Sequence, residues 1–261
     1  MVTLNLIEND FHLLKGATLK IKTKNKVFVS YSYLRRVMLE TVMKDLKFYT
    51  HPPASGLKPK QLIVLLHGYG SNGQDLISLA PYWQGAVPNA IFISPDAPFA
   101  CEMAPSPTMR QWFSLAEYTP DKLLEGTEQA EPHLQRFIDQ QLEEHNLSDE
   151  ALALVGFSQG TMMSLYSGPR RKGQIAGILG YSGALIGGES LGNHNKPPVH
   201  LIHGENDSVV PVEAYHKAYK VLHEKGFKVG GHTTTGLGHS IDESGIKSGS
   251  DFLSKILNNI S

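Results

Sequence analysis

The chain has 261 residues, of which 41% are hydrophobic and 19% are charged, and its formal net charge is −1. This is the composition of an ordinary globular domain, and it excludes the fibrous and disordered classes. A charge so close to neutral gives no reason to expect nucleic acid or an anionic membrane as a partner. One cysteine, Cys101, excludes an internal disulfide framework and any zinc site that needs two thiolates.

Two targeting patterns are missing from the sequence. No stretch reaches 18 consecutive apolar residues, so no transmembrane segment is predicted. The first residues show no apolar run followed by a small-residue cleavage site, which a secretory signal would have. Together with the single cysteine, this pattern predicts a cytoplasmic protein.

Charge divides the chain into two parts. Residues 1–39 contain seven basic and two acidic residues, whereas the rest contains 17 basic and 23 acidic residues. We therefore expect a basic N-terminal extension, residues 1–45, and a main domain, residues 46–261. Within the extension, Leu19–Ile21 and Lys26–Tyr31 could form an edge hairpin, but we favour a loosely packed segment that is dispensable for chemistry.

From about residue 45 onward, short apolar runs alternate with helical patterns. The runs are short and continuous, as in strands that are buried on both faces. The predicted strands are Lys47–Thr50, Gln61–Leu66, Ala90–Ser94, Ala151–Phe157, Ile175–Tyr181, Val199–His203 and the weaker Lys228–Thr234.

Helical patterns separate most of these runs. One helix contains Pro132, either in its first turn or inside a longer helix that begins near Lys122. Another starts just after Ser158, and two more cover Val212–Lys225 and Ser248–Ile260. The alternation predicts an α/β fold with a mostly parallel central sheet and helices on both faces. Ligands of such sheets bind at the carboxyl ends of the strands, so chemistry should be sought there.

The pentapeptide Gly-Phe-Ser-Gln-Gly, residues 156–160, lies at one such strand end and directly before a helix. A sharp strand-to-helix turn exposes the hydroxyl of its central residue, Ser158, above the sheet, and the flanking glycines leave room for the turn. This context indicates a nucleophilic serine. The alternative is a glycine-rich turn in which Ser158 only caps the helix.

A serine nucleophile needs a histidine base and an orienting carboxylate. Asp207 follows the run Val199–His203, and His239 lies in a glycine-flanked loop before the last helix. They follow Ser158 in the chain order of the α/β-hydrolase fold, which is nucleophile, acid, histidine. Glu205 and His232 are the weaker alternatives for the acid and the base. Alone, Asp207 could equally be a turn aspartate and His239 an exposed loop histidine.

The oxyanion of a tetrahedral intermediate needs two donors. In this fold one is the backbone N–H after the nucleophile, here Gln159, and the other comes from the loop after an earlier strand. The glycine-rich stretch at residues 67–73 follows a predicted strand directly, so the Tyr69 N–H is the expected second donor. His67 in the same stretch is expected to be a structural loop histidine.

Seven segments of the chain, in the same order, resemble the carboxylesterase/phospholipase family, which includes acyl-protein thioesterases and bacterial carboxylesterases. The resemblance extends from about residue 46 to the end, and it implies an α/β-hydrolase fold with Ser158 as nucleophile, Asp207 as acid and His239 as base. The matching segments are LLHGYGSNGQDL, ISPDAP, RQWFSL, GFSQGTMMSLY, GILGYSGAL, HGENDSVVP and GLGHSIDESGI.

The resemblance also assigns the oxyanion-hole N–H groups to Tyr69 and Gln159. It places Trp112 near the acyl-binding cleft, although a core aromatic is an equal alternative. It implies a serine carboxylesterase that acts on small esters or acyl lipids without metal or cofactor, with acyl-protein thioesterase or lysophospholipase as the alternative main activity. The chain departs from the family in residues 1–45 and in Gly168-Pro169, which should end the preceding helix early.

Two other classes of protein compete with a serine hydrolase. A non-catalytic acyl-binding protein would be expected to have lost a triad member, and none is missing here. A metallohydrolase could use some of the twelve histidines, but His200 and His203 lie on opposite faces of a strand and no His-Glu-x-x-His motif occurs. The sequence determines neither the natural substrate nor the oligomeric state, and a homodimer is one of the open alternatives.

Overall fold

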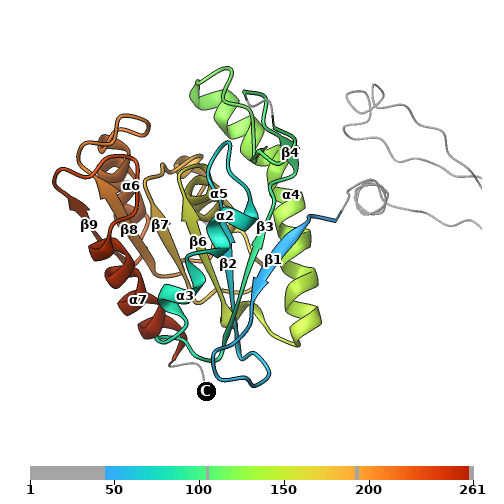
Figure 1. The fold of residues 1–261 in the computed structure, drawn as a ribbon. Coiled ribbons are helices and arrows are strands. Elements are labelled where there is room, and N and C mark those ends of the chain that lie inside the picture. Colours follow the sequence, from blue (N-terminus) through green and yellow to red (C-terminus); the bar gives the residue numbers. More distant parts are fainter. Residues whose placement is uncertain (1–44, 104–105, 192–193, 259–261) are drawn as a thin grey trace, which may run out of the picture. The chain divides into compact units, whose positions relative to one another are not determined.

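A computed structural model describes residues 45–103, 106–191 and 194–258, and residues from Leu46 onward form one unit (Figure 1). Residues 1–44, which include the possible strands Leu19–Ile21 and Lys26–Tyr31, lie outside the described residues. The expected division into a basic extension, residues 1–45, and a main domain, residues 46–261, therefore stays a prediction.

The described unit is built on a seven-stranded sheet in which all neighbouring strands are parallel except β1, which is antiparallel to β3. This confirms the predicted α/β class with a mostly parallel sheet. In spatial order the strands are β1 (Phe48–His51), β3 (Ala90–Pro95), β2 (Gln61–Leu66), β6 (Leu152–Phe157), β7 (Gly177–Tyr181), β8 (Val199–Gly204) and β9 (Val229–Thr234).

Burial explains why most of these strands were readable in the sequence. Every residue of β2, β3 and β7 is buried, because the strands lie inside the sheet and helices cover both of its faces. The edge strand β9 contains no fully buried residue, which explains its weaker apolar pattern.

Helices cover both faces of the sheet (Figure 1). The first core cluster lies between the sheet and α4 (Pro120–His145), α5 (Gln159–Ser167) and α6 (Glu213–Glu224). The second lies between the opposite face and α2 (Gly73–Ile77), α3 (Ala80–Trp83) and α7 (Glu243–Leu257). Single turns of 3-10 helix cover Asp149–Ala151 and Gly188–Leu191, and β4 (Phe99–Ala100) pairs with β5 (Arg110–Gln111) as a separate hairpin.

The boundaries of α4, α5 and α7 can be compared with those expected from the sequence. Pro132 lies inside α4, so the longer helix is the correct alternative; it starts after Thr119, whose hydroxyl accepts from the Lys122 N–H. Helix α5 ends at Ser167, directly before Gly168-Pro169, which confirms the early end. Helix α7 begins earlier than predicted, because Asp242 caps it by accepting from the Gly245 N–H at 2.8 Å.

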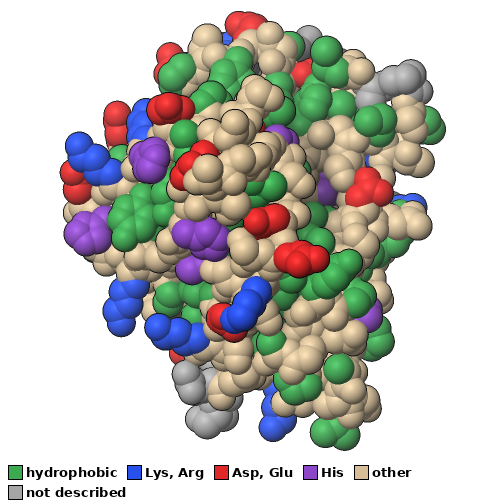
Figure 2. Space-filling view, turned by 60° about the vertical axis from the view of Figure 1, so that its left-hand side comes forward, with side chains coloured by type: hydrophobic (Ala, Val, Ile, Leu, Met, Phe, Trp, Pro, Cys, Tyr) green, Lys and Arg blue, Asp and Glu red, His purple; other side chains and the backbone are tan. Residues whose placement is uncertain are grey.

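The surface of the unit shows no concentration of one charge in the view that brings its α6, β9 and α7 side forward. Acidic, basic and histidine side chains are mixed there (Figure 2). Among the described residues, none of the helices has the length and apolar character needed to cross a membrane.

Candidate active site

Ser158 occupies the turn between β6 and α5 in a strained backbone conformation, with φ 54° and ψ −118°. Positive φ is rare for residues other than glycine and costs on the order of 1–3 kcal/mol when it persists in a folded chain. The turn is held by the Ser158 N–H, which donates to the Tyr181 carbonyl at 2.9 Å, and by the Ser158 carbonyl, which accepts from the first turn of α5. The hydroxyl-bearing residue is thus presented at the amino end of a buried helix.

The two glycines of the pentapeptide are needed for this turn. A Cβ atom on Gly156 would collide with the backbone of Gly160 and Thr161, and one on Gly160 would collide with the carbonyl oxygen of Leu66. Helix α5 therefore approaches β2 more closely than any side chain at residue 160 would allow. This is the sterical reason for the Gly-x-Ser-x-Gly spacing.

Asp207 and His239, which are 32 residues apart in the chain, meet beside this turn. His239 Nδ1 lies 2.7 Å from Asp207 Oδ2, and the Asp207 side chain is fully buried. The other carboxylate oxygen accepts from the backbone N–H groups of Val209 and Val210 at 2.9 and 2.8 Å. The imidazole ring packs against Phe157, the residue before Ser158, with ring centroids 4.9 Å apart.

The electrostatics of Asp207 favour its ionised form. Burial acts to raise the pKa of this carboxyl group, but the hydrogen bonds from His239 and from two backbone N–H groups outweigh that effect, so the pKa lies below its ordinary value. An ionised carboxylate at Nδ1 keeps the proton of neutral His239 on that nitrogen, which leaves Nε2 free to accept another proton.

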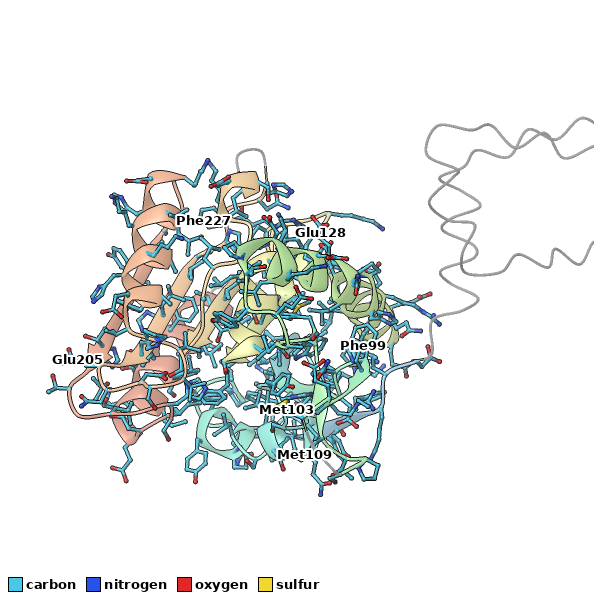
Figure 3. The ribbon with its side chains drawn as sticks, turned by 90° about the horizontal axis from the view of Figure 1, so that it is seen from above. Phe99, Met103, Met109, Glu128, Glu205 and Phe227 are labelled. Carbon is cyan, nitrogen blue, oxygen red and sulfur yellow. The ribbon has the colours of Figure 1, made fainter. Side chains whose placement is uncertain are left out.

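The weaker sequence candidates lie elsewhere. Glu205 is exposed and accepts hydrogen bonds from the hydroxyls of Thr233 and Thr235 at 2.8 and 2.7 Å. His232 lies inside β9, paired with Ile202. Figure 3, which views the molecule from above, shows Glu205 at one side of the molecule, away from Met103 and Met109 of the β4–β5 region.

Two further histidines, which the metal alternative invoked, have partners within the fold. His203 Nε2 lies 2.7 Å from the Val210 carbonyl oxygen and 3.4 Å from Asp207 Oδ2, whereas His200 binds Ser248 and stacks on Phe252. Among the described residues, no three His, Cys, Asp or Glu side chains are grouped so that they could hold a metal ion.

The expected oxyanion donors lie next to Ser158. A Cβ atom on Gly68 would lie 3.2 Å from the Cβ of Ser158, so the loop that carries Tyr69 runs directly past the serine. Gly70 has φ 76°, which lets the loop turn away after Tyr69. No hydrogen bond between described residues uses the backbone N–H of Tyr69 or of Gln159.

Trp112 does not line an open cleft. Its side chain is fully buried, and its indole N–H donates to the His67 carbonyl at 3.0 Å. His67 is also fully buried, and its two ring nitrogens bond to the Gly68 carbonyl and to the Ala97 N–H. Of the two alternatives for Trp112, the geometry favours the core aromatic over the cleft residue.

One polar cluster beside the loop that carries Tyr69 was not predicted from the sequence. The carboxylate of Glu102, just after β4, accepts from the Tyr69 hydroxyl at 3.3 Å and from the Ser114 hydroxyl and the Leu115 N–H at 2.9 Å each. These contacts connect the loop that carries Tyr69 to the hairpin and to the segment after β5. No local pattern marks Glu102, because its partners lie up to 33 residues away in the chain.

A comparison with known protein families identifies the family of this chain. The profile of the phospholipase/carboxylesterase family matches residues 53–257, which is most of the chain. The chain belongs to the phospholipase/carboxylesterase family. The match begins two residues after β1 and ends at the last residue of α7, so it covers the other six strands of the sheet and all the candidate residues.

Individual members of the family agree with this assignment. Acyl-protein thioesterase 1 of Kluyveromyces lactis is 30% identical over 78% of this chain and 96% of its own length. Esterase YpfH of Escherichia coli is 26% identical over 74% and 82%. The crystal structure of esterase PE8 is 38% identical, with a TM-score of 0.77 over 82% of this chain and all of that one. The protein is a carboxylic ester hydrolase with the α/β-hydrolase fold.

Proposed function

We propose that this family member is a serine carboxylesterase that hydrolyses short- to medium-chain carboxylic esters, with Ser158, His239 and Asp207 as its catalytic triad. The observation that carries the proposal is the 2.7 Å contact between His239 Nδ1 and the buried carboxylate of Asp207, beside a strained serine turn. Strained turns and buried acid–histidine pairs each occur without catalysis, but their combination supplies a nucleophile, a base and an orienting charge.

The proposed reaction has two steps. In the first, Ser158 Oγ attacks the ester carbonyl carbon while its proton passes to His239 Nε2, and the oxyanion accepts hydrogen bonds from the Tyr69 and Gln159 N–H groups. The tetrahedral intermediate then collapses, the C–O bond of the alcohol breaks, and the proton on Nε2 leaves with the alcohol. In the second step, water attacks the acyl-serine with the same base, and the acid and free Ser158 are released. No step requires a metal or cofactor.

A second candidate activity is hydrolysis of acyl-thioesters on proteins or of lysophospholipids. It is favoured by the relatives named acyl-protein thioesterase 1 and by membership of a family that includes phospholipases. The same triad serves all three substrate classes, because each has an acyl carbon and a leaving group that the histidine can protonate.

A hydrolysis profile separates these activities. We expect kcat/KM on p-nitrophenyl esters to be highest at short or medium acyl length, and higher than on a lysophospholipid or on an acyl-thioester of matched chain length. A clear preference for the thioester or for the lysophospholipid would replace the carboxylesterase assignment with the corresponding alternative. The Ser158→Ala protein, assayed in parallel on each substrate, serves as the blank.

We also propose that residues 46–261 carry all of the chemistry. Every candidate group lies there, and the family match starts only at residue 53. A chain that starts at Met43 should therefore keep the kcat/KM and melting temperature of the full chain. Insolubility, or a melting temperature lower by more than about 10 °C, would instead show that the preceding residues complete the core.

A further inference from the structure

The two expected oxyanion donors lie beyond the point where the sheet holds their strands together. Pairing between β2 and β6 ends at Leu66 and Gly156, and Tyr69 and Gln159 each follow three residues later. The ladder of backbone hydrogen bonds therefore does not set the distance between the two donor N–H groups. Another set of contacts must do so, since an oxyanion hole works only when its donors are placed accurately.

The side chain of Gln159 makes the first of these contacts. Its Oε1 atom accepts from the Trp112 N–H at 2.8 Å, and its Nε2 atom donates to the Phe113 carbonyl at 2.8 Å. The amide thus bonds to the backbone of two successive residues in the bend that follows β5. All three residues are almost completely buried, so water does not compete for these bonds.

Trp112 and His67 carry the connection to the other donor. The indole N–H of Trp112 donates to the His67 carbonyl at 3.0 Å, and the two rings pack with centroids 5.8 Å apart. His67 Nε2 accepts from the Ala97 N–H at 2.9 Å, so its proton lies on Nδ1, which donates to the Gly68 carbonyl at 2.7 Å. That carbonyl belongs to the peptide bond whose nitrogen is the Tyr69 donor.

The protonation state of His67 fits this arrangement. Burial lowers the pKa of its imidazole below the ordinary value, against opposing effects that include the bond to the Gly68 carbonyl. A neutral ring with one donor and one acceptor nitrogen satisfies both of its partners, whereas a charged ring would present two donors and lose the bond from Ala97.

We propose that the side chains of Gln159, Trp112 and His67 form a buried strut that sets the spacing of the Tyr69 and Gln159 N–H groups. Trp112 is then a positioning residue and does not bind the acyl chain. This inference rests on the proposed function, because it assumes that an oxyanion forms beside Ser158. Loosening the strut should weaken binding of the transition state while leaving binding of the ground-state substrate unchanged.

The two tryptophans of the chain provide a matched test. Trp112 and Trp83 are both fully buried, and each donates its indole N–H to a backbone carbonyl, at 3.0 and 3.1 Å. They belong to core clusters on opposite faces of the sheet, and Trp83 bonds to Ile246 in α7, away from the candidate donors. Trp112→Phe and Trp83→Phe therefore remove equivalent hydrogen bonds, but only the first loosens the strut.

We expect Trp112→Phe to lower kcat about 10- to 100-fold with little change in KM, because donor misplacement acts on the transition state. Its affinity for a trifluoromethyl ketone should fall by a similar factor, because an oxygen of the ketone hydrate or of the serine adduct occupies the oxyanion hole. Its affinity for a non-hydrolysable ether analogue of the substrate should not change. Trp83→Phe should show none of these kinetic effects, even if its melting temperature falls as much.

Other results would overturn the strut. Equal kinetics of the two variants would show that Trp112 is only a core residue, and a raised KM with weaker ether binding at constant kcat would show that it binds substrate. If Trp112→Phe does not fold, Gln159→Met applies the same test, because it keeps the backbone N–H and removes both amide bonds. Failure of the proposed function looks different, since the trifluoromethyl ketone would then not inhibit the wild-type enzyme.

Discussion

Replacing Ser158 with alanine is expected to lower kcat by about five to six orders of magnitude while the protein stays folded. Alanine removes the nucleophile and leaves only the small rate enhancement that the oxyanion donors and substrate binding give to direct attack by water. The change should not disrupt the fold, because no hydrogen bond between described residues uses the Ser158 hydroxyl. The measurement is steady-state hydrolysis of a p-nitrophenyl ester, with circular dichroism to check the fold.

Helix α5, which begins directly after Ser158, provides a control for this substitution. Ser164 is also buried, and its hydroxyl donates to the Gly160 carbonyl at 2.8 Å. Ser164→Ala removes a serine hydroxyl from α5 without touching the proposed triad, so we expect activity within about threefold of wild type. Activity of the Ser158→Ala protein close to that of Ser164→Ala would mean that another residue is the nucleophile.

Asp207→Asn is expected to have the second largest effect, a loss of about three to four orders of magnitude in kcat. The asparagine oxygen should take the place that accepts from the Val209 and Val210 N–H groups, since those donors need an acceptor. The amide NH₂ then faces His239 Nδ1, which must become the acceptor. The imidazole proton moves to Nε2, and the ring can no longer take the proton of Ser158.

Glu205→Gln is the matched control for this prediction. Glu205 is two residues from Asp207, but its carboxylate is exposed and accepts from two threonine hydroxyls, which the oxygen and the NH₂ group of a glutamine can also bind. We expect the Glu205→Gln variant to retain nearly full kcat/KM. A crippled Glu205→Gln beside an active Asp207→Asn would assign the orienting acid to Glu205.

The central strands were predictable because burial on both faces leaves a local trace. The run Gln61–Leu66 has its predicted bounds, and β8 differs from its prediction by one residue. Five of the six residues of the first strand are apolar, and the second has a buried apolar series that two histidines interrupt. Helices α2 and α3 were not predicted, because five and four residues are too few to show a helical period. The β4–β5 hairpin has two residues per strand and depends on contacts such as Arg110 with the carbonyls of Ala97 and Pro98.

In the site, too, residues that a local pattern marks were predictable, and side chains whose role depends on distant contacts were not. Ser158, Asp207 and His239 could be named from the sequence because each follows a strand, and parallel strands bring their carboxyl ends to one edge. The role of a buried side chain was not readable in this way. The sequence does not distinguish a cleft position from a core position for Trp112, and it indicates no role for the side chain of Gln159, because their hydrogen-bond partners lie more than 40 residues away in the chain.

The most direct test of the serine mechanism is covalent labelling with a fluorophosphonate, followed by peptide mapping. The phosphonyl group reacts only with a serine whose proton is removed and whose oxyanion is stabilised, so it reports the assembled site. We predict one adduct, on the peptide that contains Ser158, which forms at a rate that falls by orders of magnitude in Asp207→Asn and in His239→Ala. An adduct on a different serine, or an active enzyme that the reagent does not label, would contradict this prediction.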